Sequence, residues 1–174
     1  MSKLIVSYRD VDIYENDIKL FCEGNWLNDT CINFCLRKTE SALNDSILLL
    51  DPAVAAFLRY QVDDDEEMED LAKNLNVLQR KWIFIPVNDC ESLGGSGSHW
   101  SALVCHVDSG YIAHLDSNCP YNKNAAISVS EKLACLLGRY HLGYTINRTC
   151  RMPEDLTVPQ QGNGYDCGVY AVLF

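Results

Sequence analysis

The sequence contains no long apolar run and no recognisable secretory leader. Its longest uninterrupted apolar stretches cover residues 47–50 and 53–58, far short of the roughly 20 residues that a membrane-spanning helix needs. Charged residues return within the first 12 positions after a brief apolar patch, which is unlike a signal peptide. We therefore expect a protein without membrane association that resides in the cytoplasm, the nucleus or both.

The sequence also lacks clusters of basic residues. It has 14 Lys and Arg against 24 Asp and Glu, a net charge of -10, and this balance argues against nucleic-acid binding. The acidic residues concentrate between Asp63 and Asp70. A solvated first turn of a helix explains this run, since the helix dipole favours negative charge there. Steering of a basic partner surface is the alternative.

Cysteine pairs at metal-binding or redox spacing are missing as well. The nine cysteines are odd in number and spread along the chain, and no C-x-x-C motif occurs. Reduced thiols of an intracellular protein are the interpretation we favour. Cys31 and Cys35 are spaced to share one helix face, where burial accounts for them without a metal. We expect no metal and no organic cofactor.

Helices come early in the chain and an antiparallel group of strands follows, which favours the α+β class. Asp51 is suited to cap a helix that has Pro52 at its first position. Gly138 is suited to end another. No repeat and no Pro/Gly/Ser linker divides the sequence, so we expect a single domain over residues 1–174. The expected helices cover residues 30–43, 52–60, 66–78 and 131–137, and the expected strands cover residues 3–8, 46–50, 81–87 and 143–150, with a β-hairpin at about 99–117.

The hairpin can bring a histidine and a carboxylate together. If its loop has two residues, either Asp108-Ser109 or Ser109-Gly110, then His99 and Asp116 lie on the same face because side chains alternate along strands. A three-residue loop would separate their faces unless a bulge intervened. An imidazole–carboxylate pair is therefore permitted. A structural histidine and a turn aspartate are the plain alternatives.

One cysteine lies in unusual surroundings near the C-terminus. Cys167 follows a stretch rich in glutamine and glycine and opens a helix that is expected to begin near Asp166. The start of a helix favours the thiolate, and its N–H groups can bind an oxyanion. Gln161 could add a side-chain N–H, and Gly162 and Gly164 would allow the turn conformations that a Cβ forbids. From composition and spacing alone, core packing of this cysteine remains an equal alternative to catalysis.

Four motifs in a fixed order change that balance. WLND at 26–29, GSHWSALV at 97–104, HLDS at 114–117 and PQQGNGYDCG at 159–168 together resemble the sentrin/SUMO-specific cysteine proteases, the Ulp-type family of papain-like proteases. The likeness extends over nearly the whole chain. The opening IVSYRDVDIY, the VND before a GG-containing loop and EKLACLLG are most similar to the deneddylating branch of the family.

The resemblance implies a papain-like α+β fold of the Ulp type and assigns the functional residues. His99, Asp116 and Cys167 would form the catalytic triad, with Gln161 in the oxyanion hole. The tail of a ubiquitin-like modifier would be bound by four residues: Trp26, Asp29, Asn88 and Trp100. Of these, Trp100 would cover the two terminal glycines of the tail.

The implied activity is cleavage after the terminal Gly-Gly of a modifier, most similar to the NEDD type and alternatively SUMO. Its conjugates, such as cullins, would be the partners of a monomeric enzyme. Members of this family continue for several tens of residues beyond the position of Phe174, so we expect a C-terminally truncated domain. A module that binds a modifier without cleaving it is therefore a further alternative. Acyl transfer, as in distant bacterial relatives of the fold, is disfavoured by WLND.

Overall fold

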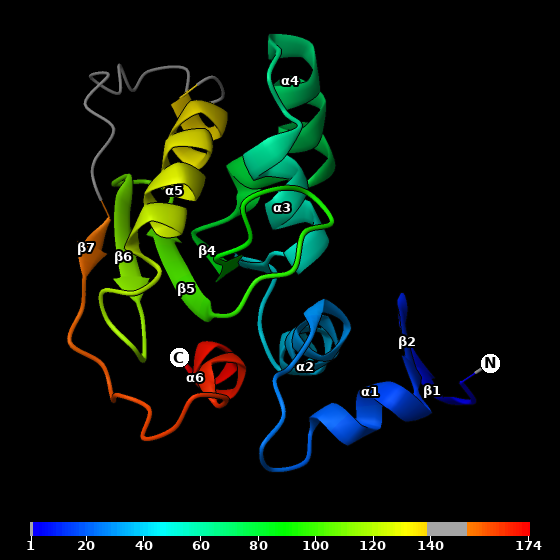
Figure 1. Cartoon of the computed structure of the whole chain (residues 1–174). Coiled ribbons are helices and arrows are strands. Elements are labelled where there is room, and N and C mark those ends of the chain that lie inside the picture. Colours follow the sequence, from blue (N-terminus) through cyan, green and yellow to red (C-terminus); the bar gives the residue numbers. More distant parts are fainter. Residues whose placement is uncertain (1, 139–152) are drawn as a thin grey trace.

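The computed structural model describes residues 2–138 and 153–174 and combines helices with two β-sheets (Figure 1). The strand expected at 143–150 lies outside the described residues. The helices are α1 Glu15–Leu20, α2 Asp29–Glu40, α3 Pro52–Tyr60, α4 Asp65–Asn74, a 3-10 helix Val77–Gln79, α5 Lys123–Gly138 and α6 Cys167–Leu173. The strands are β1 Leu4–Tyr8, β2 Val11–Tyr14, β3 Ile47–Leu49, β4 Trp82–Asn88, β5 Trp100–His106, β6 Tyr111–Leu115 and β7 Glu154–Asp155.

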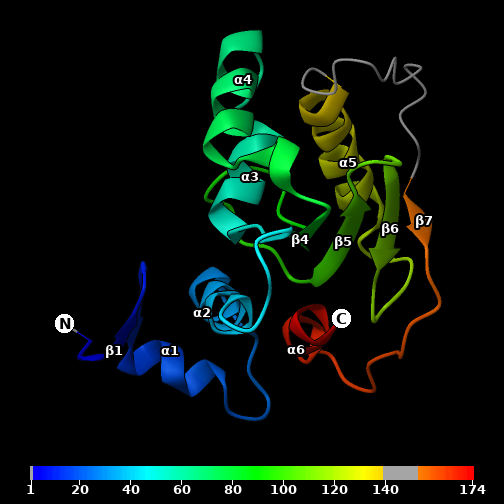
Figure 2. The same ribbon diagram turned by 180° about the vertical axis from the view of Figure 1, so that it is seen from behind.

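The central sheet is mixed and has the strand order β3-β4-β5-β6-β7. The β4–β5 and β5–β6 pairs are antiparallel, whereas β3 joins β4 and β7 joins β6 in parallel. Strands β1 and β2 form a separate hairpin. This hairpin and α1 lie beside α2, away from the central sheet (Figure 2).

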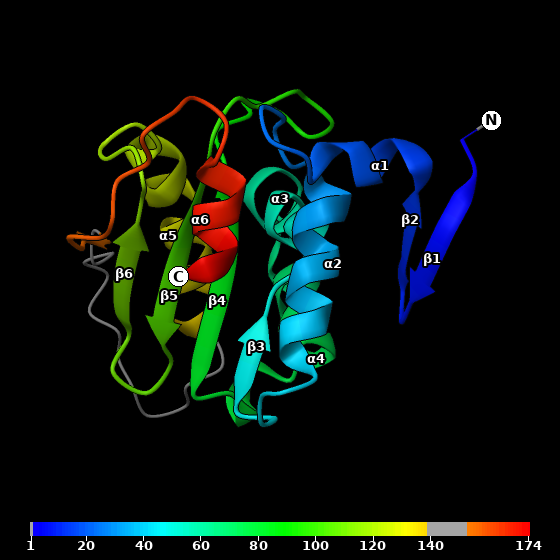
Figure 3. The same cartoon turned by 90° about the horizontal axis from the view of Figure 1, so that it is seen from below.

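Helices cover both faces of the central sheet. α3, α4 and α5 lie on one face, and α2 and α6 lie on the other (Figures 1 and 3). Successive residues of a strand point to opposite faces of the sheet. Leu48 therefore packs in the core beneath α3, α4 and α5, and Leu49 packs in the core beneath α2 and α6. The smaller core, between the sheet, α2 and α6, contains Cys167 together with Leu27 and Trp100. The proposed nucleophile, Cys167, is therefore held in place by core packing.

Several local expectations are confirmed. Asp51 caps α3, its carboxylate accepting a hydrogen bond from the Ala53 N–H at 2.7 Å, and Pro52 follows at the first helical position. The acidic run opens α4, where the Asp64 carboxylate accepts a hydrogen bond from the Glu67 N–H at 2.8 Å.

Three helix predictions were wrong in extent. The helix expected over 30–43 ends at Glu40. The helix expected over 66–78 ends at Asn74 and is followed by a separate 3-10 helix, because Asn76 adopts a left-handed conformation with φ 51°. The helix expected over 131–137 begins at Lys123 instead. Its added turns bury Ala125, Ala126 and Val129 at helical spacing.

No helix among residues 2–138 and 153–174 is both long and apolar enough to span a membrane.

Candidate active site

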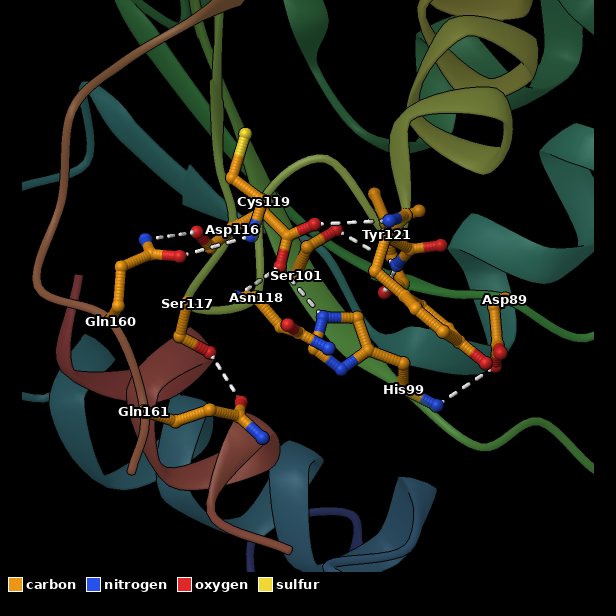
Figure 4. Close-up of polar contacts among 12 residues, drawn as sticks. Asp89, His99, Ser101, Asp116, Ser117, Asn118, Cys119, Tyr121, Gln160 and Gln161 are labelled. Carbon is orange, nitrogen blue, oxygen red and sulfur yellow. Dashed lines mark hydrogen bonds and ion pairs between the residues drawn. The ribbon is translucent and has the colours of Figure 1, made fainter. Parts of the chain in front are cut away.

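The β5–β6 hairpin pairs a histidine with an aspartate. Ala102 lies opposite Leu115 and His106 lies opposite Tyr111, so an even number of residues forms the turn, as the parity argument requires. His99 precedes β5 and Asp116 follows β6, and both are buried. Their side chains meet at 2.6 Å between His99 Nε2 and Asp116 Oδ1 (Figure 4).

The carboxylate of Asp116 is held as an anion. Besides His99, it accepts hydrogen bonds from the backbone N–H of Asn118 at 2.9 Å and of Asn122 at 3.0 Å. Burial raises the pKa of a carboxyl group, but these three hydrogen bonds and the nearby His99 outweigh it and hold the pKa of Asp116 below its ordinary value. Asp116 can therefore orient the ring and stabilise a positive charge on it.

Cys167 is the first residue of α6 and interacts with His99. Burial lowers the pKa of His99, but hydrogen bonds to Asp116 and Cys167 and the charges of those groups outweigh it and raise the pKa to about 9. Because Nε2 faces Asp116, the second ring nitrogen is left for the thiol. The structure thus brings together the three side chains proposed as a triad.

Residues that the sequence analysis did not single out hold His99 in place. Asp89 Oδ1 accepts the His99 backbone N–H at 2.9 Å, and the His99 carbonyl accepts the Asp89 N–H at 3.2 Å. The ring of Tyr121 packs edge-on against the imidazole, with 5.1 Å between the centroids. Asp89 is the last residue of the VND motif, which was the only sequence signal for it.

Two glutamines fasten the segment before Cys167 to the loop after β6 (Figure 4). Gln160 Nε2 donates to the Asp116 carbonyl at 2.9 Å. Gln161 Oε1 accepts a hydrogen bond from Ser117 Oγ at 2.7 Å, and Gln161 Nε2 donates to the Asn163 carbonyl at 2.7 Å. A primary amide has two N–H groups, so one hydrogen of Gln161 Nε2 remains for another acceptor.

The prediction for the two glycines of this turn was wrong. Neither Gly162 nor Gly164 has a positive φ, and a Cβ at either position would meet no atom within 4 Å. Space is instead critical at Gly97, where a Cβ would lie 1.7 Å from Asn88 Oδ1. The absence of a side chain is therefore needed on the loop before His99 and not on the turn before Cys167.

All four residues proposed to bind a modifier tail line one cavity of about 380 Å³. Trp100 is buried and donates its indole N–H to the Leu27 carbonyl at 2.9 Å. Trp26 is 51% exposed and donates its indole N–H to the Gly164 carbonyl at 2.7 Å. Asp29, whose pKa is raised by burial, and Asn88 complete the set. The cavity is thus tied through Trp26 to the turn that precedes the nucleophile.

Comparison with known proteins gives a consistent result. The profile of the Ulp1 protease family, C-terminal catalytic domain, matches residues 25–174. Sentrin-specific protease 8 of Homo sapiens is 28% identical over 99% of this chain and 79% of its own length. NEDD8-specific protease 1 of Arabidopsis thaliana is 29% identical over 95% of this chain and 71% of its own length.

The fold has a solved counterpart. The C-terminal Ulp1 protease domain, solved by X-ray in complex with Smt3, the yeast ortholog of SUMO, matches with a TM-score of 0.74 at 20% identity. The match covers 99% of this chain and 74% of that one. The expected α+β fold of the Ulp type is therefore confirmed.

Proposed function

Because the chain belongs to the Ulp1 protease family of cysteine peptidases, we propose that it cleaves after the terminal Gly-Gly of a ubiquitin-like modifier of the NEDD type. It would release the modifier from conjugates, cullins among them, or trim a modifier precursor, acting as a monomeric single-domain enzyme. The observation that carries this proposal is the buried His99–Asp116 pair, 2.6 Å long, beside a cysteine at the start of α6.

The proposed reaction is acyl transfer through a thioester. The Cys167 thiolate attacks the carbonyl carbon of the terminal glycine, and the C=O electron pair moves onto oxygen. The Cys167 backbone N–H and the free N–H of Gln161 stabilise this oxyanion. His99 then gives its proton to the departing amine as the C–N bond breaks. Water hydrolyses the thioester, with His99 acting as the base, and the free thiolate returns.

The cavity supports a tail substrate. Trp26 and Trp100 line it, together with three glycines of the protein itself, Gly94, Gly95 and Gly97. A narrow space beneath an indole ring suits glycines, because they have no Cβ, and excludes larger residues. Asp29, which also lines the cavity, could recognise a polar or basic group upstream of the two terminal glycines of the tail.

Trp26→Ala is expected to weaken modifier binding by roughly tenfold or more, because a half-exposed tryptophan at a binding cavity is a typical hot spot. Calorimetry with the modifier in a Cys167→Ala background measures the affinity without turnover. Trp82→Ala is the matched control, since Trp82 is also partly exposed but packs on His106 in the sheet. Equal affinities of Trp26→Ala and Trp82→Ala would remove Trp26 from the tail site.

Modifier choice is testable with three precursors that carry the same C-terminal extension. Relatives named NEDD8-specific proteases from Arabidopsis thaliana and Schizosaccharomyces pombe match over 95% and 97% of this chain. We therefore expect kcat/KM to be highest for the NEDD-type precursor, intermediate or low for SUMO, and low for ubiquitin. A higher kcat/KM on the SUMO precursor would assign the enzyme to deSUMOylation.

A further inference from the structure

A second buried histidine lies behind the triad, and the proposed reaction does not use it. His114 Nδ1 meets Asp155 Oδ1 at 2.9 Å, and His114 Nε2 meets Ser101 Oγ at 3.0 Å. Ser101 Oγ accepts a hydrogen bond from Asn122 Nδ2 at 2.8 Å. The backbone N–H of Asn122 in turn donates to Asp116 Oδ2 at 3.0 Å. A continuous set of polar contacts thus leads from β7 to the catalytic carboxylate.

The sheet explains why these residues meet. Ala102 on β5 pairs with Leu115 on β6, so the next step of the register places Ser101 opposite Asp116. His114 on β6 pairs with Asp155 on β7. Because Ser101 on β5 and His114 on β6 are both buried, neither side chain can replace its partner with bulk water. The close-up shows Ser101 next to Asp116 (Figure 4).

The direction of each hydrogen bond follows from the acceptors at the two ends of the network. Val87 O can only accept, so the Asn122 group that lies 2.9 Å from it is the amide donor Nδ2, which also donates to Ser101. At the other end, an ionised Asp155 carboxylate can only accept, so His114 donates its Nδ1–H to it. A neutral His114 then has Nε2 as an acceptor, which takes the hydroxyl proton of Ser101.

The Asn122 carbonyl accepts the Ala126 N–H at 3.0 Å at the start of α5, and the Asn122 side chain is held separately. Its side-chain oxygen is buried without a hydrogen-bond partner in the described part of the chain. The two Nδ2 bonds, to Val87 and Ser101, are therefore its side-chain anchors. Its backbone N–H is also the hydrogen-bond donor that the described structure provides for Asp116 Oδ2. Loss of the Ser101 contact would remove one of the two side-chain anchors of the residue that orients one oxygen of the carboxylate.

We propose that Ser101 and His114 are positioning residues: through Asn122 they fix the Asp116 carboxylate, and with it the His99 ring, in the orientation that the reaction needs. This inference rests on the proposed function for the reaction itself. Asp155 anchors the outer end of the network, where it also binds the partly exposed Lys123.

The first test compares Ser101→Ala and His114→Phe with wild type on the NEDD-type precursor. Misplacement of a catalytic group by a fraction of an ångström to 1 Å can cost up to about a hundredfold in rate. We expect kcat to fall roughly ten- to a hundredfold in both variants, with KM unchanged, because the tail cavity is untouched. Ser130→Ala is the matched control: Ser130 is fully buried, but its hydroxyl donates only to the Ile127 carbonyl within α5.

The second test needs no substrate. Alkylation of Cys167 by iodoacetamide is followed by peptide mass spectrometry as a function of pH, and the His99 ring is titrated by NMR. In Ser101→Ala we expect the His99 titration to move to lower pH and Cys167 alkylation to change its pH dependence. A residue that acts only in packing would lower the melting temperature and leave both curves in place. Ser101→Ala removes a single oxygen, so it keeps the test decisive if His114→Phe does not fold.

The outcomes separate the two claims. If wild type cleaves a modifier and Ser101→Ala matches Ser130→Ala in kcat and in both titrations, the positioning role is overturned while the proposed function stands. If wild type cleaves none of the three precursors but Ser101→Ala still shifts the His99 titration, the proposed function fails and the positioning of His99 stands.

Discussion

Cys167→Ala is expected to abolish turnover while modifier binding persists. Without the sulfur no thioester can form, and removing a catalytic nucleophile of this kind typically costs about 10⁴-fold to 10⁶-fold in kcat. Binding should survive because the cavity lined by Trp26 and Trp100 does not include Cys167. The sulfur packs with Leu27 in the smaller core, so its loss should cost on the order of 1 kcal/mol of unfolding free energy.

A modifier that carries a C-terminal electrophile gives the direct measurement. Wild type should gain the mass of one modifier at Cys167, and Cys167→Ala should gain none. Cys105→Ala is the control, since Cys105 is also buried and unpaired, but burial raises the pKa of its thiol to about 12. That thiol stays protonated and is no nucleophile. An adduct on Cys167→Ala, or equal turnover by Cys167→Ala and wild type, would refute the assigned nucleophile.

A third outcome addresses the alternative that the sequence left open. If wild type binds the modifier as tightly as Cys167→Ala does but forms no adduct and cleaves no precursor, the protein is a binding module and not a protease. The adduct assay and calorimetry therefore have to be performed on the same preparations.

The part of the site that depends on local geometry could be predicted from the sequence. His99 and Asp116 flank one hairpin, and the period of two along a strand relates their faces without knowledge of the rest of the fold. The predicted parity holds in the register of β5 and β6. The start of α6 at Cys167 likewise follows from residues next to it in the chain.

The supporting residues could not be predicted in this way. Ser101 and Asn122 meet at 2.8 Å although they are 21 positions apart, and His114 meets Asp155 across 41 positions. Such contacts depend on strand order and on the path of the 117–122 loop, which no local pattern specifies. The same holds for Gly97, where a side chain is excluded because the Asn88 side chain approaches it closely.

Elements that bury little were also missed. α1 contains no buried residue, so its sequence has no apolar stripe to reveal it. β7 has two residues and is defined only by its pairing with β6. Both elements are stabilised by contacts with neighbouring elements, and their own sequences carry no periodic apolar pattern that would predict them. β7 nevertheless supplies Asp155 to the network behind the triad, so a weak sequence signal does not mean a minor role.

Asp116→Asn is expected to lower kcat by about 10³-fold to 10⁴-fold, although it replaces one oxygen by a nitrogen. The Asp116 oxygens accept from three donors, namely His99 Nε2 and the backbone N–H groups of Asn118 and Asn122. An amide has only one acceptor oxygen. If its NH₂ group faces His99, Nε2 must accept and the proton moves to the nitrogen that faces Cys167. The ring could then no longer take the thiol proton.

The pH dependence provides an independent readout with a defined sign. In wild type the pKa of His99 is raised above its ordinary 6.5 to about 9, so the stabilisation by its positive charge is complete below 6.5 and is lost as the pH rises through 9. The pKa of Asp116 is lowered, so its contribution is present above 3.8 and is lost in acid. Asp116→Asn should therefore lose most unfolding free energy, relative to wild type, between pH 3.8 and 6.5.

The alkaline limb of the kcat profile should move in the same variant. Without the Asp116 anion the His99 pKa loses its main upward contribution, so the protonated ring that donates to the leaving amine disappears at lower pH. Asp64→Asn is the matched control, because Asp64 caps α4 through one accepted hydrogen bond and asparagine caps a helix equally well. A kcat within tenfold of wild type and an unmoved alkaline limb would show that Asp116 does not orient His99 for the reaction.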